Sequence, residues 1–90
     1  MSAFTVELDN IGNIDQGQNP YEPVFGIPRG VEEVDTLEQA SSACRKYIEL
    51  HNLGGGNWIG GKVFDQSGTQ VAYISYNGRI WSPDRSRELI

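Results

Sequence analysis

One segment of this chain carries the pattern of an amphipathic helix, and this limits what the chain can fold into. Thr36 and Gln39 fit a capping box at its start, and Gly54 supplies a left-handed C-cap. Apolar side chains recur between these ends at the three- and four-residue spacing of one helix face: Leu37, Ala40, Cys44, Tyr47, Ile48 and His51. The sequence therefore predicts one helix, Thr36–His51, with room for strands on either side.

The segments around this helix have the period-two pattern and the residue types of strands. Residues 3–8 alternate apolar and polar side chains, and residues 62–64, 70–76 and 79–81 are rich in β-formers. A short edge strand is also expected around residues 24–27. We therefore expect an α+β fold, in which a four- to five-stranded antiparallel sheet has one α-helix packed on one face.

Asn77-Gly78 favours a two-residue type I′ turn, which predicts the register of the last hairpin. This register pairs Tyr76 with Arg79 and Ile74 with Trp81. One face would then carry Ala72, Ile74, Tyr76, Arg79 and Trp81, and the other Val71, Tyr73, Ser75 and Ile80. Both faces are substantially apolar, but one helix covers only one of them. The residue 9–30 loop, a second copy or a partner would have to cover the other.

The length of 90 residues predicts a single domain, 1–90. Residues 9–30 form a turn-rich loop whose apolar residues suggest that it packs on the body, and residues 82–90 form a C-terminal tail. No stretch approaches the roughly 18 apolar residues of a membrane span, and the N-terminus lacks a basic and an apolar signal region. We therefore expect a cytoplasmic protein without a membrane partner, acting in the host cytoplasm if a phage encodes it.

The net charge of −5 is unevenly distributed along the chain. Residues 1–50 hold nine acids and three bases, whereas residues 51–90 hold three acids and four bases. An acidic front half disfavours non-specific phosphate binding and suits docking onto a basic protein surface. Solubility alone would explain the same charge.

The sequence contains no set of residues with the spacing of a catalytic or metal site. Cys44 and His51 share a helix face but lie about 10.5 Å apart along its axis, too far for a nucleophile and its base. One cysteine and one histidine do not make a zinc site. Residues 56–62 match the start of a P-loop, but Val63 stands where Ser or Thr is needed. We therefore expect neither an enzyme nor a cofactor. For Trp58 two interpretations are open: it caps the end of the core, or it is exposed as a binding anchor.

The candidate partner-binding residues are two tyrosines, an arginine and three acids. Tyr73 and Tyr76 are predicted as anchors on opposite sheet faces, supported by Arg79, because Tyr and Arg are enriched at interface hot spots. An acidic flank would steer a basic partner: Glu32, Glu33 and Asp35. The alternative is that the tyrosines only cover the core and the acids only precede the helix. A homodimer also remains open.

A second function class remains open, because aromatic and arginine side chains also bind single-stranded nucleic acid. Such a platform would use the aromatic hairpin residues and the nearby arginines: Tyr73, Tyr76, Arg79, Trp81, Arg85 and Arg87. The negative net charge and the lack of a surrounding basic stripe count against it.

Residues 36–81 resemble a group of small phage and bacterial proteins. The resemblance lies in a helix with Ala43-Cys44-Arg45-Lys46-Tyr47-Ile48, then Gly56-Asn57-Trp58, then a strand meander ending in Asn77-Gly78-Arg79 and Trp81. This order is also similar to that of some small anti-CRISPR proteins. The resemblance implies a compact inhibitor that occupies a surface of a host defence effector, with a CRISPR effector subunit as the partner.

Overall fold

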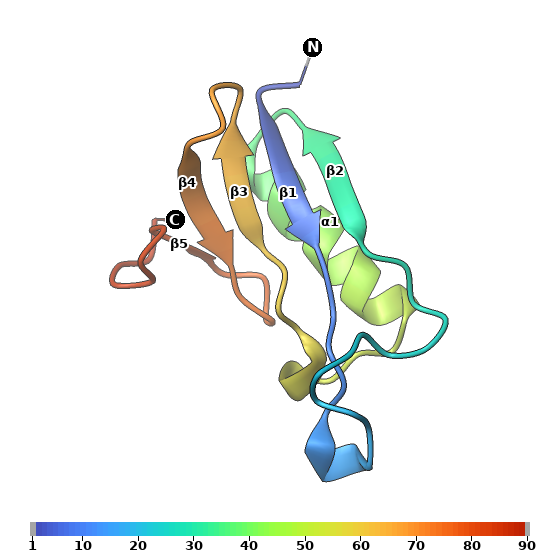
Figure 1. The fold of residues 1–90 in the computed structure, drawn as a ribbon. Helices are drawn as coiled ribbons and strands as arrows, with labels where there is room; N and C mark the ends of the chain where they lie inside the picture. The colour runs from blue at the N-terminus through green and yellow to red at the C-terminus, as the bar shows by residue number, and fades with distance from the viewer. Residues whose placement is uncertain (1, 90) are drawn as a thin grey trace.

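The computed structural model describes residues 2–89, which form one helix packed on one face of a five-stranded antiparallel sheet. The strands are β1 (Phe4–Leu8), β2 (Gly30–Val34), β3 (Lys62–Asp65), β4 (Gln70–Ile74) and β5 (Ile80–Trp81), and the helix is α1 (Leu37–Leu50). The strand order is β2-β1-β3-β4-β5, with α1 behind the sheet in Figure 1. Short 3-10 helices lie at Ile14–Gln16 and Gly55–Asn57. The predicted α+β fold class is confirmed.

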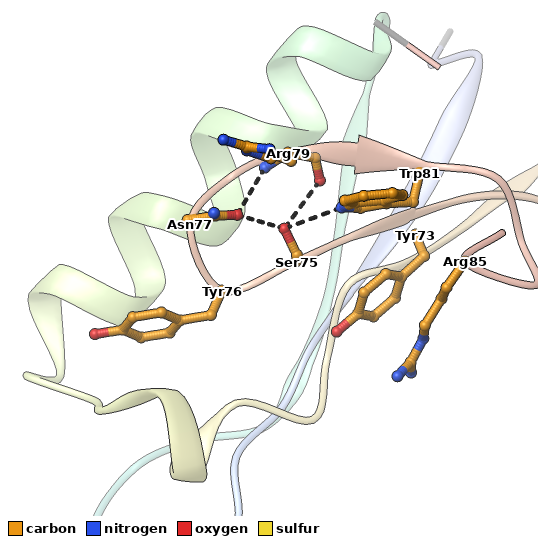
Figure 2. Close-up of a pocket in the computed structure, with 7 residues that line it drawn as sticks. All are labelled: Tyr73, Ser75, Tyr76, Asn77, Arg79, Trp81 and Arg85. Atoms are coloured by element: carbon orange, nitrogen blue, oxygen red, sulfur yellow. Dashed lines mark hydrogen bonds between the residues drawn. The ribbon is translucent and has the colours of Figure 1, made fainter. Parts of the chain in front are cut away.

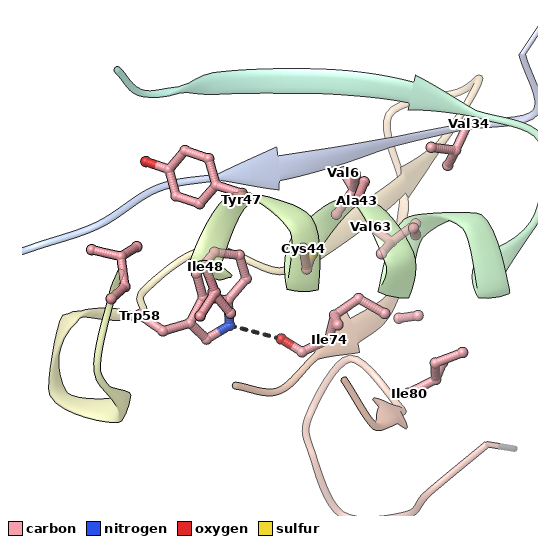
Figure 3. Packing of buried hydrophobic residues seen from close by; sticks show 13 residues of the cluster. Val6, Val34, Ala43, Cys44, Tyr47, Ile48, Trp58, Val63, Ile74 and Ile80 are labelled. Carbon is pink, nitrogen blue, oxygen red and sulfur yellow. Dashed lines mark hydrogen bonds between the residues drawn. The ribbon is translucent and has the colours of Figure 1, made fainter. Parts of the chain in front are cut away.

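The core lies between α1 and the sheet, because each strand turns alternate residues toward the helix. Val6, Val63, Ala72 and Ile74 are fully buried on this side of the sheet. The helix contributes Ala40, Ala43, Cys44, Tyr47 and Ile48 (Figure 3). Trp58 closes one end of this core, where its indole N–H donates to the Ile74 carbonyl at 3.0 Å. The interpretation of Trp58 as a core cap is therefore confirmed, and its alternative as an exposed anchor is wrong.

The predicted cap is correct at the N-terminal end of α1 and wrong at its C-terminal end. Thr36 is the N-cap, and its hydroxyl accepts from the Gln39 N–H at 3.0 Å. At the other end Asn52, with φ of 55°, takes the left-handed conformation assigned to Gly54, whose φ is −90°. The Leu53 N–H reaches back to the Ile48 carbonyl at 2.9 Å, which makes a Schellman motif. The left-handed residue therefore lies two positions earlier than predicted, and the motif buries Leu53 against the core.

The edge strand predicted around residues 24–27 is wrong. This segment is a tight turn in which the Ile27 N–H donates to the Val24 carbonyl at 3.2 Å and Gly26 has φ of 84°. The strand at this edge of the sheet is instead β2, which pairs with β1. Pro23 and Pro28 flank the turn and cannot donate to a ladder, whereas residues 30–34 can.

The residue 9–30 loop lies beyond the ends of β1 and β2, not across the sheet face (Figure 1). Asn10 is buried at its base and Ile27 packs against the core. Ile14, Tyr21 and Phe25 are exposed, so the loop packs on the body only in part. The sheet face opposite α1, which we call the open face, is therefore not covered by this loop.

The predicted hairpin register is wrong by one residue. Tyr73 pairs with Trp81 and Ile74 with Ile80, because the loop contains three residues, 76–78, with Gly78 at φ of 88°. The Gly78 N–H donates to the Ser75 carbonyl at 2.9 Å, as in a type I turn followed by a left-handed glycine. A shift of one residue exchanges the faces of a strand. Ile80 therefore enters the core, and Trp81 moves to the open face beside Tyr73.

The C-terminal tail folds back along β5. Trp81 forms an isolated bridge with Glu88, and the Leu89 N–H donates to the Ile80 carbonyl at 2.8 Å. Leu89 packs against the core, which ties the tail to the sheet. In residues 2–89, no helix has the length and apolar character needed to cross a membrane.

Candidate functional site

The open face contains a hollow of about 450 Å³ beside the β4–β5 hairpin (Figure 2). We call it the hairpin hollow, and its lining residues are Tyr73, Ser75, Tyr76, Asn77, Arg79, Trp81 and Arg85. Three are aromatic and two are arginines. These side chains combine flat apolar surface with positive charge, which suits a partner that offers apolar groups next to carboxylates or phosphates.

The register of the hairpin creates this hollow. Because the turn has three residues, Trp81 lies opposite Tyr73 on the open face. The Trp81 indole N–H donates to the Ser75 hydroxyl oxygen at 3.3 Å, and the Ser75 hydroxyl donates to Asn77 Oδ1 at 2.6 Å. These bonds hold the indole ring in place without a partner, so little side-chain entropy is lost when a partner binds.

Arg85 reaches the hollow from the C-terminal tail. Its guanidinium carbon lies 3.9 Å from the centroid of the Tyr73 ring, within the range of a cation–π contact. Its backbone has φ of 64°, an uncommon conformation for a residue other than glycine. Asp84 holds the turn, because one carboxylate oxygen accepts from the hydroxyls of Ser82 and Ser86, each at 2.7 Å. The turn therefore positions Arg85 against the aromatic wall.

This turn should respond to acid at the carboxylate of Asp84. Hydrogen bonds from Ser82 and Ser86 lower the pKa of Asp84 to about 2. A folded-state pKa below the ordinary value stabilises the turn at neutral pH, and this stabilisation is lost as the pH falls from about 4 through 2. We expect the Ser86 amide resonance, followed by NMR, to titrate with a midpoint near pH 2. Asp84→Asn should remove this step, and a midpoint near pH 4 in the native chain would contradict the assignment.

Tyr76 and Tyr73 both line this hollow, although Tyr73 lies on the open face and Tyr76 reaches toward α1. Tyr76 belongs to the turn, and its hydroxyl donates to the Leu53 carbonyl at 3.1 Å. The guanidinium of Arg45, from α1, lies 5.3 Å from the centroid of its ring. Arg79 is exposed beside the hollow, 3.9 Å from a carboxylate oxygen of Glu88. The structure therefore brings the three predicted residues Tyr73, Tyr76 and Arg79 together.

The predicted acidic flank lies elsewhere. Glu32 and Glu33 belong to β2, which is separated from β4 by β1 and β3. With strands about 4.8 Å apart, this places Glu33 roughly 14 Å from Tyr73 across the sheet. Asp35 precedes α1, and its N–H donates to Gln39 Oε1 at 2.7 Å. The acids and the hollow are thus two separate regions, and the role of each in partner binding stays a prediction.

The reactive side chains considered from the sequence show no catalytic geometry. Cys44 is fully buried, and desolvation, with a smaller effect from Glu32, raises the pKa of its thiol to about 12. His51 packs its ring against Tyr47 at a centroid distance of 4.9 Å. Among residues 2–89, no group of three or more His, Cys, Asp or Glu side chains could hold a metal ion.

We expect the Cys44 thiol to be unreactive in the folded protein, because only the thiolate is nucleophilic and burial disfavours it. A thiol reagent should label it only when urea unfolds the chain. Cys44→Ala should keep partner binding and lower the free energy of unfolding by about 1–2 kcal/mol through lost core contacts. A folded Cys44→Ala protein that loses its activity would instead indicate a nucleophilic or redox role.

As candidate site residues, Trp81 and Arg85 were predicted from the sequence only in the nucleic-acid alternative, and Ser75 and Phe25 were not predicted. Phe25 is fully exposed at 102% on the turn over residues 24–27. The Ser82-Pro83-Asp84 sequence favours the turn that holds Arg85, because Ser and Asp side chains form hydrogen bonds with backbone groups close to them in the chain. Gly26 after Phe25 was a comparable signal for an exposed turn residue.

Comparison with known proteins gives no relative for this chain: no protein-family model, curated protein or solved structure matches it. The function of the chain must therefore be inferred from the site itself.

Proposed function

We propose that the chain is a non-catalytic module that binds another protein, with the hairpin hollow at the centre of the interface. The observation that carries the proposal is the meeting of Tyr73 and Trp81 with Arg79 and Arg85 at one hollow on the open face. Tyr, Trp and Arg are the residue types that dominate binding energy at protein interfaces.

The charges of the hollow suggest the chemistry of the bound group. Arg85 supplies a guanidinium group beside the Tyr73 ring, and Arg79 lines the same hollow with its guanidinium near Glu88. Arg85 already stacks on Tyr73, so its charged N–H groups remain available at the edge of the ring. A partner segment with an apolar or aromatic side chain next to a carboxylate would satisfy both features.

The resemblance of residues 36–81 to small anti-CRISPR proteins extends this proposal. It makes a CRISPR effector subunit the partner, and inhibition by covering one of its surfaces the result. The exposed acids at the far edge of the sheet would then steer the chain toward a basic surface of this partner, chiefly through the association rate.

The test compares variants of the hollow with a matched variant outside it. A tagged chain is used to isolate a stoichiometric partner from host lysate, which mass spectrometry identifies, and the affinity of the purified pair is measured by calorimetry. Trp81→Ala and Arg85→Ala should each weaken binding by about 30-fold or more, which corresponds to about 2 kcal/mol. Leu50→Ala, 72% exposed at the end of α1, should leave the affinity unchanged. Unchanged affinity in folded Trp81→Ala and Arg85→Ala would place the interface elsewhere, first on the residue 9–30 loop.

Single-stranded nucleic acid is a second candidate for the same hollow. The observation that favours it is the placement of Tyr73, Trp81 and Arg85 on one face, as in proteins that stack bases on aromatic rings. A salt titration with a single-stranded DNA oligonucleotide separates the two candidates. Tight binding that weakens steeply between about 50 and 200 mM salt (about 10-fold or more) would favour nucleic acid over a protein partner.

A further inference from the structure

We infer that the outer edge of β2 is a strand-addition site for an extended segment of another protein, with a basic residue opposite Glu33 and an apolar residue opposite Val31. The site is separate from the hairpin hollow, because β1 and β3 lie between β2 and β4.

The hydrogen bonds of β1 show which backbone groups of β2 are available. The Glu7 carbonyl accepts from the Gly61 N–H at 2.8 Å, so the backbone groups of Glu7 face the β3 side. Along a strand these groups alternate between the two sides, so Val6 faces β2 and bonds with its register partner Glu32. The N–H and C=O groups of Val31 and Glu33 therefore point outward, where no strand of residues 2–89 lies. An added strand can bond to them.

The side chains along this edge select the added strand. Val31 is 66% exposed and lies with Glu33 on the open face, because both alternate with Glu32. In an antiparallel addition, the residues opposite Val31 and Glu33 are two positions apart and also lie on the open face. Opposite charges in such cross-strand pairs are stabilising and like charges are destabilising. The added strand therefore needs a basic residue two positions before an apolar one.

A second hollow, of about 690 Å³, lies next to Glu33 on the open face. Its lining includes Thr5, Glu33, Phe64 and Asp65. A lysine or arginine opposite Glu33 would lie at the rim of this hollow, beside the Glu33 carboxylate. On the helix side, a hollow beside Glu32 is also lined by Lys46. This lysine already supplies a positive charge near Glu32, so the added strand does not need a basic residue on that side.

The same charges disfavour a second copy of this chain as the added strand. Two β2 edges can pair in antiparallel fashion through their outward residues in three registers, centred on Val31, Glu32 or Glu33. The last two place Glu32 opposite Glu32, or Glu33 opposite Glu33, which is destabilising. The register centred on Val31 needs Arg29 opposite Glu33, but Arg29 already pairs with Asp9 at 2.6 Å. With a net charge of −5 on each copy, a basic partner strand fits this edge better than a second copy.

The probe is a synthetic nine-residue peptide with valine at its centre, lysine two positions before it and threonine elsewhere. In NMR titrations and amide-exchange measurements on the full chain, the Val31 and Glu33 amide protons should shift and exchange at least about 10-fold more slowly. The Glu32 amide, already bonded to β1, should keep its exchange rate. A peptide with glutamate in place of lysine should bind at least about threefold more weakly, and Glu33→Lys should reverse this preference.

Three results would overturn the inference: unchanged Val31 and Glu33 amides at millimolar peptide, equal binding of both peptides, or concentration-dependent protection of these amides without peptide. The last would assign the edge to a second copy. Trp81→Ala should bind the peptide as the native chain does. The outcome is therefore independent of the function proposed for the hairpin hollow.

Discussion

We expect Gly61→Ala to lower the free energy of unfolding by about 3–5 kcal/mol, because neither the space nor the backbone at this position accepts a side chain. A Cβ atom there would lie 2.2 Å from the Ile74 carbonyl oxygen, and Gly61 has φ of 102°. The same carbonyl accepts from the Trp58 indole, and the Ile74 N–H donates to the Gly61 carbonyl at 2.8 Å. Moving β4 away would weaken both bonds. Urea unfolding measures the loss.

Gly68→Ala is the matched control, since Gly68 has φ of 86° but a Cβ atom at this position would meet no other atom within 4 Å. The substitution should therefore cost only the strain of a left-handed backbone, about 1–2 kcal/mol. Equal losses in Gly61→Ala and Gly68→Ala would mean that backbone conformation alone matters, and that the close approach to β4 relaxes without cost.

The second large effect is expected at Asn10, which joins the residue 9–30 loop to the core. Asn10 is 1% exposed, its side-chain N–H donates to the Tyr47 hydroxyl at 2.9 Å, and its Oδ1 accepts from the Val24 N–H at 2.7 Å. Asn10→Ala removes both bonds and leaves a small cavity. We expect a loss of about 2–4 kcal/mol in the free energy of unfolding, and much faster exchange of the Val24 amide.

Asn13→Ala is the corresponding control within the same loop. The Asn13 side chain accepts from the Asp15 N–H at 3.0 Å in an exposed turn, so its loss should cost about 1 kcal/mol or less and leave the Val24 amide unchanged. If Asn10→Ala were as mild as Asn13→Ala, the loop would be held by other contacts. The exposed Phe25 turn would then not depend on the Asn10–Tyr47 pair.

The sequence by itself determined the helix, four of the five strands and the α+β class. These features depend on local patterns: the apolar stripe and cap of residues 36–51, and the β-forming runs of residues 3–8, 62–64, 70–76 and 79–81. Such patterns reflect side-chain spacing and backbone preference within a few residues, so they can be recognised without knowledge of the rest of the chain. The sequence also named Tyr73, Tyr76 and Arg79 as candidate residues, and all three line the hairpin hollow.

Only the tertiary structure decided the hairpin register, and with it the candidate site. Asn77-Gly78 fits a two-residue or a three-residue turn, and the choice depends on burying Ile80 beside Ile74 under α1. This burial moves Trp81 to the open face, where Arg85 arrives from the tail. The pairing of residues 30–34 with β1 likewise depends on contacts between distant segments. Long-range packing, which no local pattern contains, therefore separated the acids of β2 from the hairpin hollow and left a strand edge open beside them.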